Sequence, residues 1–153
     1  KRMYRIIEFG QSRLDILGKV IALEYDPNRT SFIALVQYPG NQKCYILAPQ
    51  DLKVGDEVIC SEKAILAPGN RTKIKYLPVG TMIHNIEFVP GRGGIAVKGA
   101  GTAAQILAQD GEYAQLKMPS TEIRKIKNDC FASIGVISNP EHRFVNLGKA
   151  GRA

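Results

Sequence analysis

Short β-prone runs separated by turn-forming clusters constrain the fold of this chain more than any other feature of its sequence. Residues 20–25 end at Asp26-Pro27-Asn28, and residues 32–38 are followed by Pro39-Gly40-Asn41 and the run 43–47. The second and third of these runs predict a hairpin, and residues 57–60 predict a further short strand.

The second half of the chain has the same pattern. Residues 81–89 predict a strand, residues 104–108 and 113–117 flank the hairpin signal Asp110-Gly111, and residues 122–126 and 133–137 complete a meander. Strands this short and this regularly spaced are typical of all-β barrels or sandwiches. Two small barrels fit 153 residues, and a single sandwich is the alternative.

The break Pro78-Val79-Gly80 predicts a domain boundary. Residues 1–78 carry 12 Lys and Arg against 8 Asp and Glu, and residues 79–153 carry 9 against 6. Since both halves are basic, we expect the binding surface to span both. We also expect the chain, which starts at Lys1 and stops at Ala153, to be the ordered middle of a longer protein.

The net charge of +7 suits nucleic acid, an anionic membrane or an acidic protein as partner. No run approaches the roughly 20 apolar residues of a membrane span, and no basic amphipathic helix is visible, so a membrane partner is not expected. Cys44, Cys60 and Cys130 are odd in number and widely spaced. We expect reduced thiols in a cytosolic or organelle-matrix compartment, with no disulfide and no metal site.

The stretch 90–101 is the most informative part of the sequence, with five glycines in twelve residues. Glycines allow close approach of backbone to a partner and leave amides free to face phosphate, so Gly91, Gly93 and Gly94, with the charges of Arg92 and Lys98, are candidate phosphate contacts. The equally weighted alternative is a floppy surface loop. The spacing fits no nucleotide-binding motif.

Other candidates are arginines and lysines in turns and clusters. Arg29 follows the turn Asp26-Pro27-Asn28 and offers a planar fork of donors, although a solvated turn arginine is the default alternative. Basic clusters supply the remaining candidates, which are Arg2, Arg5, Arg71, Lys73, Lys149 and Arg152, and a further cluster spans residues 124–127. One cluster alone is more often a solvated face, but several together suit a polyanion.

Catalysis finds little support in the sequence. Neither His84 nor His142 lies near a nucleophile signature, and no set of residues has zinc spacing. We therefore expect no enzyme, no cofactor and no small-molecule substrate. Two rival functions stay open: a free OB-type binder of single strands, which needs stacking aromatics, and a small enzyme with a cleft lined by His84 or His142.

Several motifs stand in the order found in one family. The chain resembles the bacterial-type large-subunit ribosomal protein two family (the universal L-two family) over essentially its whole length, through EYDPNR (24–29), YILAP (45–49), PVG (78–80), HNIE (84–87), PGRGG (90–94), AGT (100–102) and LGKAG (147–151). The resemblance implies an OB-like RNA-binding barrel at residues 1–78, an SH3-like barrel at 79–138 and the start of a C-terminal extension at 139–153.

The resemblance also implies a function. Such proteins are structural constituents of the large ribosomal subunit: they bind its ribosomal RNA, contact neighbouring ribosomal proteins, support subunit assembly and association, and shape the peptidyl transferase region. It implies that Arg29 and the basic residue at Lys98 bear on RNA binding, and that the chain resides on ribosomes of a bacterial cytoplasm or an organelle matrix (mitochondrion or plastid).

Three residues depart from the family pattern. Lys98 and Phe131 stand where arginine is usual, and Thr121 replaces the glycine of a Ser-Gly turn. The charge at Lys98 is kept but the bidentate fork is lost. These departures predict a divergent member, from an organelle or a reduced genome.

Overall fold

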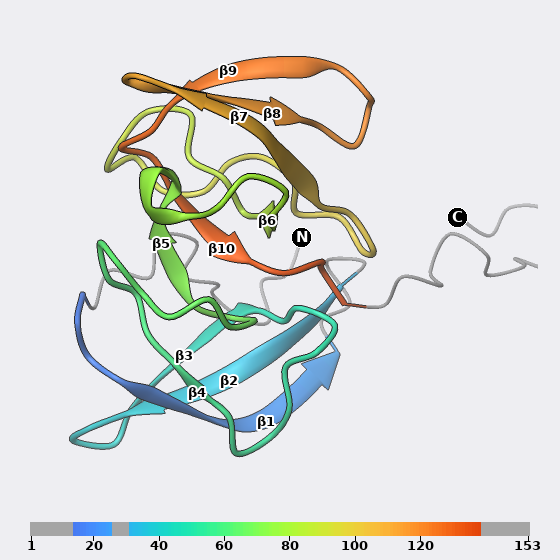
Figure 1. Cartoon of the computed structure of the whole chain (residues 1–153). Helices are drawn as coiled ribbons and strands as arrows, with labels where there is room; N and C mark the ends of the chain where they lie inside the picture. The colour runs from blue at the N-terminus through green and yellow to red at the C-terminus, as the bar shows by residue number, and fades with distance from the viewer. Residues whose placement is uncertain (1–13, 26–30, 139–153) are drawn as a thin grey trace, which may run out of the picture.

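The structure is a computed structural model that describes residues 14–25 and 31–138, which form two curled antiparallel sheets (Figure 1). The first sheet has the order β3-β2-β1-β4 and is built from β1 (Gly18–Tyr25), β2 (Phe32–Tyr38), β3 (Gln42–Leu47) and β4 (Glu57–Val58). The second has the order β5-β10-β6-β7-β8-β9 and is built from β5 (Arg71–Lys73), β6 (Met82–His84), β7 (Ala104–Asp110), β8 (Tyr113–Lys117), β9 (Ile123–Lys127) and β10 (Phe131–Ile134).

This arrangement confirms the predicted all-β fold of an OB-like barrel followed by an SH3-like barrel. The short 3-10 helix η1 (Ile74–Tyr76) is the one helix in the described ranges. None of the described residues belongs to a helix long and apolar enough to cross a bilayer.

Two β-bulges curl the sheets. The register between β1 and β2 shifts between Val20 and Ala22, and that between β7 and β8 shifts between Ile106 and Ala108. A bulge adds one unpaired residue to a strand and increases the local twist. Each long strand therefore bends around its own core instead of extending a flat sheet.

Each sheet encloses a separate apolar core. In the first, residues such as Val20, Val36 and Val58 are fully buried. The second is formed around Ile83, Ile106 and Leu116, which are also fully buried. The absence of Trp is compensated by branched aliphatic residues, whose burial contributes roughly 1.5–3 kcal/mol each.

The chain passes from one sheet to the other before the boundary predicted at Pro78. Strand β5 pairs with β10 of the second sheet, and Ile74 and Leu77 belong to the second core. Residues 71–77, assigned to the first domain from sequence, therefore pack with the second. The proposed extension at 139–153 lies outside the described residues.

Both predicted hairpins are confirmed, at residues 39–41 and at 111–112. Two predicted strands are shorter than expected because the backbone turns into the left-handed region. The strand predicted at 81–89 ends at His84, before Asn85 (φ 51°), and the strand predicted to continue to Ile137 ends before Gly135 (φ 118°). Asparagine and glycine adopt this conformation at lower cost than other residues.

Backbone hydrogen bonds join the two barrels. The Arg71 amide donates to Ile59 O at 2.9 Å, and the Ser138 amide donates to Ala48 O at 2.9 Å. The Phe32 amide donates to the hydroxyl of Ser138 at 3.0 Å. The ends of the second barrel are thus fixed on the first.

The turn between β8 and β9 keeps a glycine-like backbone at Thr121. Its φ is 72°, which is rare for a β-branched residue, and its amide donates to Met118 O at 2.9 Å. The departure from the family's Ser-Gly pattern therefore changes the side chain but retains positive φ.

Candidate nucleic-acid interface

Five of the predicted RNA contacts lie outside the described residues: Arg2, Arg5, Arg29, Lys149 and Arg152. The undescribed segments contain 8 of the 21 Lys and Arg but only 3 of the 14 Asp and Glu. The described residues accordingly carry 13 cations against 11 anions, a net +2 of the total +7. Most of the basic excess therefore belongs to residues 1–13, 26–30 and 139–153.

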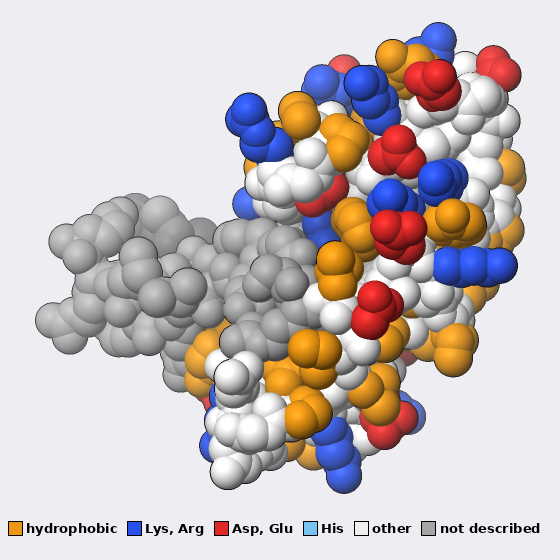
Figure 2. Space-filling model, turned by 90° about the vertical axis from the view of Figure 1, so that its left-hand side faces the viewer, with side chains coloured by type: hydrophobic (Ala, Val, Ile, Leu, Met, Phe, Trp, Pro, Cys, Tyr) orange, Lys and Arg blue, Asp and Glu red, His pale blue; other side chains and the backbone are white. Residues whose placement is uncertain are grey.

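The described surface reflects this balance. Figure 2 shows a face on which Lys and Arg alternate with Asp and Glu, without one continuous basic patch. On this face the cations are therefore individually placed and do not form a uniform positive field.

The structure corrects the prediction that the side chain of Arg71 contacts RNA. Its side chain is fully buried, and one terminal guanidinium nitrogen, Nη1, donates to Asn85 O at 2.6 Å and to Ser133 Oγ at 3.0 Å. Burial lowers the pKa of Arg71 to about 10, although the nearby Cys60 and Glu87 oppose the shift, so the guanidinium is charged at neutral pH. It holds β5, β10 and the backbone just after β6 together, and its buried side chain is not available to RNA.

Lys73, two residues further on, is mostly covered. Its side chain is 19% exposed and its amine lies 3.6 Å from the Glu62 carboxylate. An ion pair with an exposed partner of this kind contributes at most about 1 kcal/mol, so RNA phosphate can compete for Lys73.

The glycine-rich segment is organised by a buried carboxylate, Glu87. One oxygen accepts the amide of Gly91 at 3.2 Å and that of Phe131 at 2.9 Å, and the other accepts the amide of Gly93 at 2.9 Å. Glu87 is 3% exposed, and its own amide donates to Phe131 O at 3.1 Å. The acid thereby ties the loop to β10.

This geometry corrects how the glycines act. The amides of Gly91 and Gly93, predicted to face phosphate, instead face Glu87. Both glycines have positive φ (83° and 86°), which lets successive amides turn toward one carboxylate. The segment is therefore neither a phosphate-binding nest nor a floppy loop.

Gly94 is needed for a different reason, which is close packing. A Cβ there would overlap Asn85 Oδ1 and lie 2.8 Å from Asn85 O. After Gly94 the chain runs back beside residues 85–86. The amides of Asn85 and Ile86 donate to Val97 O and Ala96 O, at 2.9 Å each. Lys98 directly follows these hydrogen-bonded residues and is half-buried. Its backbone therefore extends from an ordered segment, not from a mobile one.

The cations presented at this loop are arginines. Arg92 is exposed between the two clamped glycines, and its amide donates to Val89 O at 3.1 Å. The guanidinium of Arg124, on β9, lies 4.3 Å from the ring centroid of Phe88 in the same loop. Cation–π contact holds Arg124 in place without neutralising its charge.

Sequence reasoning did not single out two residues that organise this loop. Arg124 was noticed only as part of a basic cluster, because its partner Phe88 is distant in sequence. Glu87 was noticed only within the HNIE motif. The available signal was an acid four residues before Gly91 and six before Gly93, a spacing that lets a carboxylate accept amides of the following turn.

His84, a candidate base in the sequence, is enclosed by the fold. His84 is 1% exposed, and its Nδ1 donates to Gly135 O at 2.8 Å. Burial, assisted by the charge of Arg71, lowers the pKa of His84 to about 4 despite that hydrogen bond. An enclosed imidazole of this kind is a structural donor, not an accessible base.

Cys60 and Cys130 are equally unsuited to nucleophilic chemistry. Burial raises the pKa of Cys60 and of Cys130 to about 11, so both are neutral thiols. Across residues 14–25 and 31–138, no three His, Cys, Asp or Glu side chains gather into a metal-binding group.

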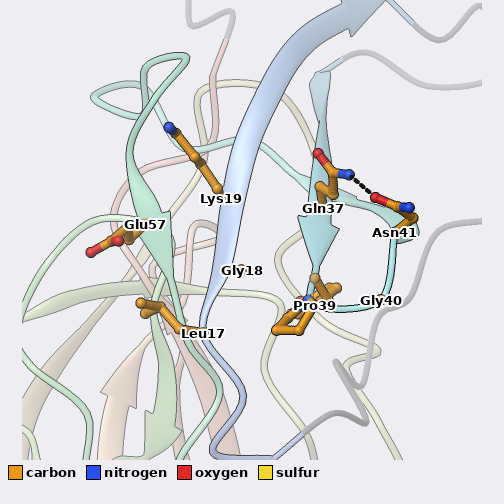
Figure 3. Close-up of a pocket in the computed structure, with 9 residues that line it drawn as sticks. Leu17, Gly18, Lys19, Gln37, Pro39, Gly40, Asn41 and Glu57 are labelled. Carbon is orange, nitrogen blue, oxygen red and sulfur yellow. Dashed lines mark hydrogen bonds between the residues drawn. The ribbon is translucent and has the colours of Figure 1, made fainter.

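A shallow pocket beside β1 and β2 is lined mainly by uncharged residues (Figure 3). Its charged residues are Lys19 and Glu57, which are register partners on β1 and β4, and Gln37 donates to Asn41 at its rim at 3.0 Å. No His, Cys or Ser lines it, so the pocket holds no Ser–His or Cys–His nucleophile pair.

Comparison with known proteins decides the family. Residues 1–60 match the family profile described as Ribosomal Proteins L2, RNA binding N-terminal domain, and residues 67–153 match the Ribosomal Proteins L2, C-terminal domain. The chain belongs to the ribosomal protein L2 family. The resemblance of its motifs is thereby confirmed, and the gap between the two matches coincides with the passage between the sheets.

Individual L2 relatives agree. The chain is 49% identical over 153 residues to the large ribosomal subunit protein uL2 of Rhodospirillum rubrum, covering 100% of this chain and 55% of the relative. It is 49% identical over 152 residues to the protein of the same name from Roseobacter denitrificans, covering 99% and 54%. The chain thus spans about half the length of these L2 relatives.

The close packing at Gly94 yields a stability prediction. Gly94→Ala should lower the free energy of unfolding by about 1–3 kcal/mol, because the new methyl group forces Asn85 backbone and side chain to move. Gly99→Ala is the matched control, since a Cβ there meets only Thr102, at 3.9 Å. Urea unfolding measures both, and equal stability of the two variants would contradict the packing argument.

The buried imidazole yields a pH prediction. His84 has a folded pKa of about 4 against 6.5 when free, so unfolding takes up a proton between these values and the free energy of unfolding falls as pH falls from about 6.5 to 4. The slope contributed is about 1.4 kcal/mol per pH unit.

His84→Asn should remove this contribution, while His142→Asn should leave it in place. Denaturant titrations at pH 5 and pH 7 compare the three proteins. The same pH dependence in wild type and His84→Asn would show that His84 is not the titrating group.

Proposed function

We propose that this chain is a structural, RNA-binding constituent of the large ribosomal subunit, in contact with large-subunit ribosomal RNA and neighbouring ribosomal proteins. The observation that carries the proposal is the match of residues 1–60 to an RNA-binding family domain, in a chain whose relatives are named large ribosomal subunit proteins. The proposed location is the ribosome, in a bacterial cytoplasm or an organelle matrix. Roles in subunit assembly, subunit association and the peptidyl transferase region belong to the same proposal.

The proposed mechanism is electrostatic and geometric. Lys and Arg side chains neutralise phosphates and release counterions, and folded RNA is read through shape, phosphate and 2′-OH groups. Gly91, Gly93 and Gly94 shape the loop surface. The proposed cationic contacts are Arg29, Arg92, Lys98, Lys73, Arg2, Arg5, Lys149 and Arg152. Neither a cofactor nor a small-molecule substrate, nor any catalysed reaction, is part of the proposal.

One observation favours a second mode, stacking of unpaired bases. Tyr25 and Phe32 are register partners at the ends of β1 and β2, and they are 60% and 40% exposed. Exposed aromatic rings stack on bases without strong sequence preference. This exposed pair supplies the stacking aromatics that the single-strand alternative needs.

The test uses purified protein, large-subunit ribosomal RNA and two competitors of equal length, an unrelated structured RNA and a single-stranded homopolymer. If about six phosphates are neutralised, log K should fall against log salt with a slope of roughly −4 to −5. Binding of large-subunit RNA should persist to higher salt concentrations than binding of either competitor. A flat salt response would refute the electrostatic mechanism, and homopolymer binding as tight as the specific RNA would favour stacking.

The same assay ranks two proposed contacts. Arg29→Ala should weaken binding by about tenfold to a hundredfold, because a guanidinium grips two acceptors while the ammonium of Lys98 is a point charge. Lys98→Ala should cost less, and Lys98→Arg should keep or improve affinity. Lys43→Ala, at an exposed strand position, is the control. Near-wild-type RNA affinity of Arg29→Ala would show that Arg29 is not part of the RNA interface.

A further inference from the structure

Glu87 is the only buried carboxylate among the described residues, and its hydrogen bonds are concentrated on one loop. Its two oxygens bind the amides on either side of Arg92, at Gly91 and Gly93. A third amide, from Phe131 on β10, binds the oxygen that Gly91 binds. An isolated buried charge would be costly, so this concentration of donors, near the buried Arg71, needs a structural purpose.

The consequence of the clamp falls on Arg92. Residues on both sides of Arg92 are fixed to Glu87, and its own amide is bound to Val89 O at 3.1 Å. Arg92 itself is exposed, and it is the one charged residue between Glu87 and Lys98. The loop therefore directs its amides inward and a single guanidinium outward.

From this geometry we propose that Glu87 is a positioning residue for RNA: it fixes the backbone around Arg92 so that the Arg92 guanidinium is held ready for a phosphate of the ribosomal RNA. The inference rests on the proposed function and specifies how one part of the interface works. A negative charge near an RNA-binding surface would ordinarily weaken binding. Here the charge is buried and bound by three amides, so it contributes order without facing the phosphate.

Ordering the loop in advance should increase affinity. A flexible loop must lose conformational freedom when it binds, whereas a clamped loop has lost it on folding. Arg92→Ala should weaken binding about tenfold or more, since a charge-assisted contact is removed, and should make the salt slope shallower by about 0.7–0.9. Glu87→Gln should weaken binding about twofold to tenfold, because the amide group cannot accept from every N–H that the carboxylate binds.

The deciding experiment is a double-variant comparison of affinity for large-subunit RNA at one fixed salt concentration. If Glu87 acts through Arg92, Glu87→Gln should cost almost nothing once Arg92 is Ala. Independent effects would instead multiply. Glu112→Gln is the matched control, since it removes one exposed carboxylate, raises the net charge by the same amount and leaves the clamp intact.

The outcomes separate the two levels of proposal. Failure of wild-type protein to prefer large-subunit RNA overturns the proposed function. Wild-type preference with multiplicative losses, or with no loss in Glu87→Gln, overturns the positioning role alone. A test that needs no variant is amide hydrogen exchange of the free wild-type protein. Gly91 and Gly93 should be protected, and exchange at the rate of an unstructured loop would overturn the clamp.

Discussion

The buried carboxylate of Glu87 is the interaction on which the functional part of this structure depends. It sits where β6 has ended, where the chain must leave the sheet and return, and it binds amides from both the loop and β10. The guanidinium of Arg71 is buried near Glu87 and is bound to Asn85 and Ser133. Two opposite charges in one interior region reduce the cost that either would have alone.

This polar region also links fold to binding. Arg71 is the first residue of β5. Its backbone bonds to Ile59 and Ser61, next to β4 of the first barrel, while its side chain bonds to Asn85 and Ser133 of the second. Arg71 therefore takes part both in the contact between the two barrels, which we call the seam, and in the region just before the glycine-rich loop. We expect a change at the seam to reach the loop, because packed interiors transmit displacement instead of absorbing it.

Strand positions and turn chemistry made the fold largely predictable from sequence. The hairpins at Pro39-Gly40-Asn41 and Asp110-Gly111 follow from local signals, since those residues favour the turns that the strands need. The ends of β6 and β10 were not predictable in this way. Asn85 and Gly135 adopt positive φ there, but one Asn or Gly in a β-prone run does not by itself mark the end of a strand. The passage between sheets lies before Pro78, and the sequence offers two local breaks there, Pro68-Gly69-Asn70 and Pro78-Val79-Gly80, between which local signals do not decide.

The site was less predictable, for a physical reason. A basic residue in sequence looks the same whether it is exposed or buried, so Arg71 was grouped with surface cations although the fold encloses it. Glycine-rich sequence correctly indicated an unusual backbone but not which group the amides face. Only the three-dimensional position of Glu87 distinguishes an amide nest for phosphate from a clamped loop that presents Arg92.

Protein–RNA crosslinking is the most direct measurement of whether this surface meets ribosomal RNA. Purified protein is crosslinked to large-subunit RNA by ultraviolet light, and the attached peptides are mapped by mass spectrometry. Crosslinks should gather in the loop around Arg92 and in the turn that contains Arg29, and should be sparse around Lys19 and Glu57. Crosslinks confined to that shallow pocket, or no more abundant than with an unrelated RNA, would contradict RNA recognition through the clamped loop.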